Sequence, residues 1–418
     1  MTHFNGIVRD ISKNNREPDW LLDLRLSALE AFEKTPPPAK NEEEWRKVDL
    51  NQILFSDLQV YSDASPKISL LSDAPHGVFA GTLSQAVKDI PDKVRPCLER
   101  SLAHNVRKYD ALVNALWNGG VFVHVPENLQ ADLPISMSLK PQAGQSGGVR
   151  PAYFPKRHIV LEKNSSLTLV SEEISNEGWG GWIGSQTEII LKAGAKLSLV
   201  RTQLADRKST LVSSFYSTLE RDASLNFIVV SAGSALNKSN WSANIVGEGA
   251  SACVFGLVKG EGTQNFDHSV LLTHQAPHSS SNVLFKTAMK DKSRSLFTGL
   301  IHVWKAAQKT AAYQTNRNLL LSREARADTL PKLEIEADDV KCGHGAAVSN
   351  VDPDQIYYLM TRGLSREAAQ SIILEGFYED VLGKFLENLN SAGAPKIKEE
   401  LLSYFHRILF SGQQTVTI

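Results

Sequence analysis

The sequence is poor in cysteine: its 418 residues contain three, which stand far apart at Cys97, Cys253 and Cys342. Three widely separated thiols give no basis for a disulfide framework, and so few are typical of proteins from the reducing cytosol. We therefore expect a cytoplasmic protein whose fold depends on buried apolar surface. The length is ample for a large core and predicts two or three structural units.

The sequence also lacks the features expected of a membrane-spanning, secreted or nucleic-acid-binding protein. No stretch approaches the roughly 18 consecutive apolar residues of a membrane-spanning helix. The first ten residues show no basic segment followed by an apolar one, so we expect no secretory signal. The net charge is −1, with 22% charged residues, which gives no electrostatic reason for binding nucleic acid or an anionic membrane.

The motifs of several enzyme classes are absent from the sequence. The pair Gly383-Lys384 is followed by Phe385 and lacks the upstream glycine of a phosphate-binding loop, so we expect no ATP hydrolysis by that route. The sequence contains no His-Glu-x-x-His, no Gly-x-Ser-x-Gly and no Cys-x-x-Cys. Metalloprotease, esterase and dithiol redox activities of these types are therefore not expected.

The first part of the chain, residues 1–120, has mainly helical periodicity. After Pro18, apolar residues recur at steps of three and four until Thr35-Pro36-Pro37-Pro38, where consecutive prolines end the helix. Residues 82–117 give further helical pattern, which Asn118-Gly119-Gly120 stops. We expect an N-terminal helical region at residues 1–120.

The middle of the chain, residues 121–351, has the alternation of β-strands. A unit of strand, tight bend and strand recurs as residues 161–169, 191–199, 219–227 and, more weakly, 246–254, with degraded copies near 289–297 and 321–329. The first four copies begin 30, 28 and 27 residues apart. Such units bury their apolar face by stacking, which predicts a β-solenoid. A β-sandwich built from similar hairpins is the alternative.

Helices return at about residue 352 and are expected to form a domain at residues 352–418. Asp352 and Pro353 begin the first helix, which should stop at Gly363. Ser365 caps a second helix that runs to about Phe377. A third amphipathic stretch, residues 397–409, precedes a short tail.

The main candidate site is Cys342-Gly343-His344. In an extended strand, residues two apart share a face, so the thiol and the imidazole would point the same way. These two ligand types suit iron, zinc and copper(I), but they make half of a site. The competing interpretation is a buried cysteine and a hydrogen-bonded histidine. A second group, His268, His274 and His278, is better explained as strand and loop histidines, because Pro277 disfavours a helix there.

Five segments resemble the SufB/SufD family of SUF iron–sulfur cluster assembly proteins, at residues 43–46, 314–322, 333–346, 352–363 and 372–377. The string Asp-Asp-Val-Lys-Cys-Gly-His-Gly, residues 338–345, is the most specific of them. The chain looks like the SufD branch. SufB carries a cysteine where this chain has Thr315, and His-Glu-Ala where this chain has His344-Gly345-Ala346.

The resemblance implies a mainly β fold, with a right-handed parallel β-helix core between N-terminal and C-terminal helical regions. It implies a scaffold subunit that is not an enzyme. The end of the β-helix would pair with a SufB-like subunit, and residues 352–418 would dock a SufC-like ABC ATPase. Whether the isolated chain also pairs with itself stays open.

For the site, the resemblance implies an iron–sulfur cluster held transiently and shared with SufB. His344 would be a ligand or positioning group, and Cys342 a second candidate metal ligand. A cluster is conventionally held by about four thiolates, so this chain has too few to hold one alone. Two alternatives are a purely structural stabiliser of SufB and a carbohydrate-active β-helix enzyme, which would need clustered carboxylates.

Overall fold

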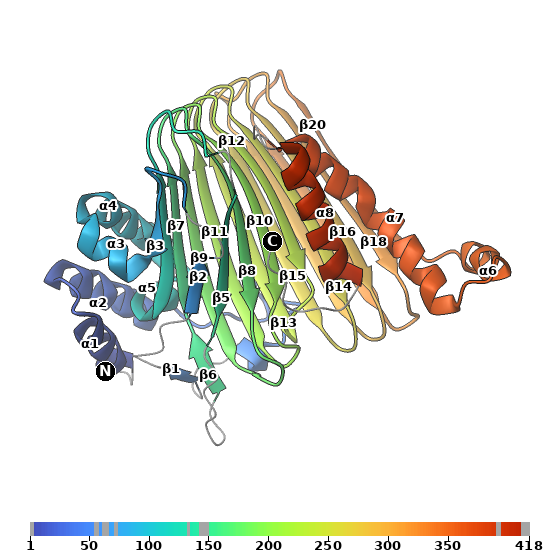
Figure 1. Ribbon diagram of the computed structural model, residues 1–418, viewed down its shortest axis with the longest axis horizontal. Coiled ribbons are helices and arrows are strands. Elements are labelled where there is room, and N and C mark those ends of the chain that lie inside the picture. The colour runs from blue at the N-terminus through green and yellow to red at the C-terminus, as the bar shows by residue number, and fades with distance from the viewer. Residues whose placement is uncertain are drawn as a thin grey trace.

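The computed structural model describes residues 4–53, 58–60, 67–70, 74–131, 134–141, 150–389 and 394–410. Most of the strands form two long sheets that face each other, with helices at both ends of the chain (Figure 1). The predicted tail after residue 410 lies outside the described residues. None of the described helices is long and apolar enough to cross a membrane.

The chain passes back and forth between the two sheets and forms a parallel β-solenoid of about seven turns. Its strands are β4 (Gly119–Val125), β5 (Ile135–Lys140), β6 (Arg150–Tyr153), β7 (Pro155–Leu161), β8 (Ser166–Ile174), β9 (Trp182–Leu191), β10 (Lys196–Leu204), β11 (Thr210–Leu219), β12 (Ser224–Ser231), β13 (Leu236–Ile245), β14 (Ser251–Gly260), β15 (Asn265–His274), β16 (Ser280–Met289), β17 (Arg294–Val303), β18 (Ala311–Leu320), β19 (Arg326–Ile335) and β20 (Lys341–Asn350).

The odd-numbered strands from β7 to β19 stack in one sheet, which we call the odd sheet, and the even-numbered strands from β8 to β20 stack in the other, the even sheet. All pairs within these two runs are parallel, as a solenoid requires and a sandwich of hairpins does not allow. The predicted β-solenoid is therefore confirmed.

The repeats found in the sequence mark the bends between paired strands. Leu161, Leu191 and Leu219 end β7, β9 and β11 and stand in register with one another. In β13 the residue in register with Leu219 is Ile245, not Val246. The bend after β13 is one residue longer than the three earlier bends, so the start of the fourth copy was placed one residue too late. The degraded copies near 289–297 and 321–329 also mark a strand, a bend and a strand, but they fall on the opposite bends, after β16 and β18, and are out of phase with the first four.

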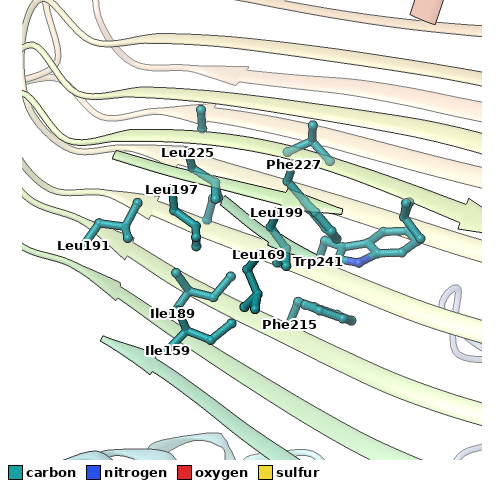
Figure 2. Close-up of a cluster of buried hydrophobic side chains, with 14 of the residues drawn as sticks. Ile159, Leu169, Ile189, Leu191, Leu197, Leu199, Phe215, Leu225, Phe227 and Trp241 are labelled. Atoms are coloured by element: carbon teal, nitrogen blue, oxygen red, sulfur yellow. The ribbon is translucent and has the colours of Figure 1, made fainter. Parts of the chain in front are cut away.

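The core lies between the two sheets, where the inward-facing residues of successive strands stack on like residues. Figure 2 shows part of this stack, with aliphatic side chains of both sheets in contact with the aromatic rings of Phe215, Phe227 and Trp241. These three residues are at most 5% exposed. Burial of side chains of this size contributes roughly 1.5–3 kcal/mol each, which makes the stack the main source of stability.

The N-terminal helices pack on the outer face of the first odd-sheet strands, through a cluster that includes Trp117, Trp182 and Val212. They are α1 (Phe4–Asn15), α2 (Asp19–Lys34), α3 (Leu83–Asp89), α4 (Pro91–Ser101) and α5 (Lys108–Leu116), with the short 3-10 helices η1 (Leu50–Ile53) and η2 (Leu102–Val106).

This N-terminal region is less purely helical than predicted. Three short strands, β1 (Leu58–Val60), β2 (Lys67–Leu70) and β3 (Phe79–Thr82), pair with β6, β5 and β4. They extend the two sheets at the start of the solenoid. The division of the chain at residues 120 and 351 stays a prediction.

The C-terminal helices are α6 (Pro353–Thr361), α7 (Arg366–Glu387) and α8 (Ala394–Phe410). Asp352 and Ser365 cap α6 and α7, as predicted. The second helix runs ten residues beyond Phe377, because Val381 and Phe385 continue its apolar face against the outer face of the even sheet. In contrast, α6 stands away from the body (Figure 1).

Candidate functional site

The Cys-Gly-His segment lies at one end of the solenoid, in the last strand of the even sheet. Within the part of the chain that the structure describes, β20 pairs only with β18, and β19 pairs only with β17. Both sheets therefore end here with one strand edge unpaired. We call this end of the solenoid, formed by β19 and β20, the open end.

Cys342 and His344 lie on the inward face of β20. Cys342 stands in register with Ala312 and His344 with Gln314, and both of these β18 residues are buried in the interior. The shared face expected from the two-residue spacing is therefore present. In the earlier turns, the inward-facing side chains are covered by the turn that follows. No described strand follows β20 in its sheet, so its inward face stays accessible.

The two side chains differ in their surroundings. Cys342 is partly buried and packs, as Leu333 and Val340 do, against a small apolar cluster that includes Ile301 and Ala312. This burial raises the pKa of its thiol, and a hydrogen bond with the backbone of Ala312 offsets part of the effect. The imidazole of His344 is exposed. The imidazole is therefore accessible at the surface, whereas the thiol is partly covered.

A polar layer lies directly beneath His344. Its register neighbour Gln314 donates from Nε2 to the carbonyl of Lys332 at 3.1 Å, across the interior in β19. Asn318 donates to Asn316 Oδ1 at 2.7 Å and to the carbonyl of Ala347 at 3.2 Å. Gln314 joins the two sheets, Asn318 bonds within the even sheet, and together these amides make the end of the interior polar.

The open end also carries apolar side chains that sequence reasoning missed. Ile335 and Val348 are 41% and 46% exposed, although the alternation of β19 and β20 directs both inward. Inward-facing residues of this kind are normally covered by a following turn. Their alternation was visible in the sequence, as was the end of the strand pattern near residue 351, but their exposure at that end was not.

The second histidine group does not come together as a site. His268 is buried in the interior beside Trp241 and Phe285, and burial lowers its pKa to about 3. His274 bonds Ser279 and Ser281 through its two ring nitrogens. The sequence interpretation of strand and loop histidines is confirmed.

A complete metal site is not found among the residues that the structure describes, which contain no cluster of three or more His, Cys, Asp or Glu side chains arranged for a metal ion. Cys342 and His344 thus provide at most two ligands. Their donor atoms suit iron. The arrangement can therefore present half of a metal site at the surface of the open end.

A second exposed region lies on α6. Tyr357 is 70% exposed, Tyr358 57% and Met360 39%, while Ile356 in the same helix is buried. Large apolar and aromatic side chains gathered on one exposed helix are typical of protein interfaces. The sequence showed the helix but not this exposure.

Comparison with known proteins agrees with the resemblance. The family model described as "SUF system FeS cluster assembly, SufBD core domain" matches residues 143–377. The chain is similar to the iron–sulfur cluster assembly protein SufD of Bacillus subtilis, with 28% identity over 96% of each chain. It is 25% identical to SufB of the same organism, over 89% of this chain and 87% of that protein. A SufBD family protein of Staphylococcus haemolyticus is 25% identical over 90% of this chain and 88% of that protein.

Proposed function

The chain belongs to the SufBD family of the SUF system for iron–sulfur cluster assembly, and on that premise we propose that it is a scaffold subunit that hydrolyses no ATP itself. The observation that carries the proposal is the placement of Cys342 and His344 on the uncovered inward face of β20. A half-site at an open end matches a protein that builds clusters together with a partner.

The partner that we propose is a SufB-like subunit, and the open end is its binding surface. Lys341 N–H donates to Thr310 and Val351 N–H to Leu320, so the alternating residues between them direct their backbone groups toward β18. The backbone groups of Cys342, His344, Ala346 and Val348 then point to the unpaired edge. Strands of a second solenoid can pair with this edge and cover Ile335 and Val348.

Within the family we place the chain in the SufD branch. It has Thr315 where SufB has its cysteine, so the partner has to bring that thiol. In the proposed complex, His344 binds or positions the cluster from this side. Cys342 is a second ligand if iron displaces its proton, which the raised pKa of the thiol opposes. The cluster is the cargo of the complex and leaves it after assembly.

The energy source is proposed to be a SufC-like ATPase that docks on α6 and the start of α7. The exposed Tyr357, Tyr358 and Met360 support this assignment. Because α7 packs on the outer face of the even sheet, whose last strand is β20, a movement of these helices can act on the open end. We propose that ATP hydrolysis opens the site between the two scaffold subunits through such a movement.

One observation favours a narrower role for the thiol. Cys342 packs against the apolar cluster of Ile301 and Ala312 in the manner of a small apolar residue. A chain that only stabilises its SufB-like partner would need neither Cys342 nor His344. The double variant Cys342→Ser/His344→Ala separates the two roles, because normal cluster assembly on an intact complex would establish the purely structural one.

The test is co-purification with a SufB-like subunit and a SufC-like ATPase, followed by iron and sulfide analysis. We expect His344→Ala to leave the complex intact and to lower its iron and sulfide content severalfold. His76→Ala is the matched control, since His76 is also exposed but lies near β3, at the other end of the solenoid. Undiminished cluster content in His344→Ala would disprove the ligand role.

A further inference from the structure

The interior of the solenoid contains a buried group of charges that the proposed function does not use. Arg157 on β7 and Arg201 on β10 both pair with Glu173 on β8: the distance from Arg157 Nη2 to Glu173 Oε1 is 3.2 Å, and Arg201 Nη2 bonds Glu173 Oε2. Each of the three residues is at most 3% exposed. Two guanidinium groups share one carboxylate, and arginine stays protonated in proteins. The group therefore carries one positive charge in excess.

Several donors of this group have no partner among the residues that the structure describes. They are Nε and Nη1 of Arg157 and Nε of Arg201. The hydroxyls of Ser171 and Thr187 are unpartnered as well. Register explains why they gather: Thr187 stands beside Arg157 in the odd sheet, and Ser171 beside Arg201 in the even sheet.

These four side chains line one small cavity between the sheets. Its volume is about 10 Å³, measured as the room for the centre of a water-sized sphere, which is about what one small occupant needs. The rest of the lining is apolar and includes Ile159, Leu169 and Leu199, all labelled in Figure 2. No carboxylate is among the lining residues described.

We propose that this cavity is a binding site for one monovalent anion of about the size of chloride. The lining offers guanidinium and hydroxyl donors, and a net positive charge in apolar surroundings attracts an anion strongly. A cation is excluded by the same charge, and an oxyanion such as phosphate is too large for the space. Chloride and hydrosulfide share the required charge and shape.

The site would stabilise the solenoid by binding only to the folded chain. Its anion neutralises the excess charge that Arg157 and Arg201 leave in the interior. Since ligand binding stabilises in proportion to the logarithm of concentration, we expect the melting temperature to rise by roughly 1–2 °C for each tenfold increase in halide above the dissociation constant. Ionic strength is kept constant with gluconate, which is too large to enter.

The experiment uses the full chain, refolded in bromide or in gluconate. We expect a bromide anomalous peak between Arg157 and Arg201 in crystals, together with the melting-temperature rise. Arg157→Met leaves the balanced Arg201–Glu173 pair and should abolish the dependence on halide. The milder Thr187→Val keeps all charges and should weaken bromide binding roughly tenfold, through the loss of one hydrogen bond to a charged group.

A competition experiment distinguishes the two candidate anions, chloride and hydrosulfide. Anaerobic titration with sulfide in place of halide, at the same ionic strength, compares hydrosulfide with chloride, and the tighter binder is the natural occupant. A cavity that holds only water in bromide crystals, with a melting temperature that does not respond to halide or sulfide, would overturn the proposal. So would an unchanged halide dependence in Arg157→Met.

Discussion

The open end predicts the effect of a charge placed at Val348. The side chain is 46% exposed in the free chain and lies on the inward face of β20, four residues beyond His344 in the same strand. If a partner solenoid covers this face, Val348→Asp puts a carboxylate into a newly buried apolar contact. In the free chain, the same carboxylate stays in water.

The magnitude follows from the exposure. Full burial of a valine contributes roughly 1.5–3 kcal/mol, so covering the exposed half contributes about 1 kcal/mol. Burying an unpaired polar group costs about 2 kcal/mol more. The sum of about 3 kcal/mol corresponds to roughly 100-fold weaker pairing with the SufB-like subunit. The free energy of unfolding of the isolated chain should change by no more than about 0.5 kcal/mol.

The assay is titration of the SufB-like subunit with wild type and variant, combined with thermal unfolding of each chain alone. Val246→Asp is the matched control, because Val246 is 39% exposed but lies in the bend between β13 and β14. It should pair like wild type. Wild-type affinity of Val348→Asp would refute the assignment of the open end as the pairing surface.

Three further predictions follow from the same structure. Ala346→Pro removes an N–H that points to the unpaired edge, so it should abolish pairing with the SufB-like subunit and leave the fold intact. Ala347→Pro removes a hydrogen bond to β18 and should lower the free energy of unfolding by roughly 1 kcal/mol or more. Equal effects of the two variants in co-purification and in urea denaturation would contradict the edge assignment. His268 has a pKa lowered from 6.5 to about 3 by burial, so the unfolded chain binds a proton that the folded chain does not, and stability falls as the pH drops below 6.5. In urea denaturation at pH 7 and pH 5, His268→Phe should therefore lose less stability than wild type, by up to about 2 kcal/mol, and an unchanged pH dependence would count against the assigned pKa. Tyr357→Ala/Tyr358→Ala should lose the ATPase subunit in co-purification without a change in melting temperature, since both rings are exposed, and retention of the ATPase would place its docking surface elsewhere.

The solenoid was predictable because the residues at its bends repeat with a regular spacing along the sequence. Leu161, Leu191 and Leu219 precede bends of equal length, and each bend ends in a buried alanine or serine, so the copies align. The period is harder to see after Ile245, where the bends from the odd sheet to the even sheet lengthen. Bend length is set by how successive turns stack, which one strand's sequence does not contain.

The helical ends were predictable at their starts and less so at their stops. Asp352 and Ser365 carry their own capping oxygens, which act locally. The end of α7 depends instead on Val381 and Phe385, which pack on a sheet far away in sequence. Gly376 and Gly383 lie within this helix because tertiary packing outweighs their low helix propensity.

The shared face of Cys342 and His344 was predictable, because a two-residue spacing in a strand determines it. Their role as ligands stays a prediction. The differing environments of Cys342 and His344 were not predictable, since the partial burial of the thiol arises from its packing against an apolar cluster that includes Ile301 and Ala312, on other strands. The buried charges Arg157, Glu173 and Arg201 were also missed. They come from three different strands, and only the register of the two sheets brings them together.

The central claim is that this chain contributes His344 to a cluster completed by its partner. The most direct measurement is pulsed electron paramagnetic resonance of the reduced cluster on the complex, with ¹⁵N-histidine in this chain alone. The account predicts a ¹⁵N coupling of a directly bound nitrogen in wild type and its loss in His344→Ala. A cluster without such a coupling in wild type, or a coupling that survives in His344→Ala, would contradict it.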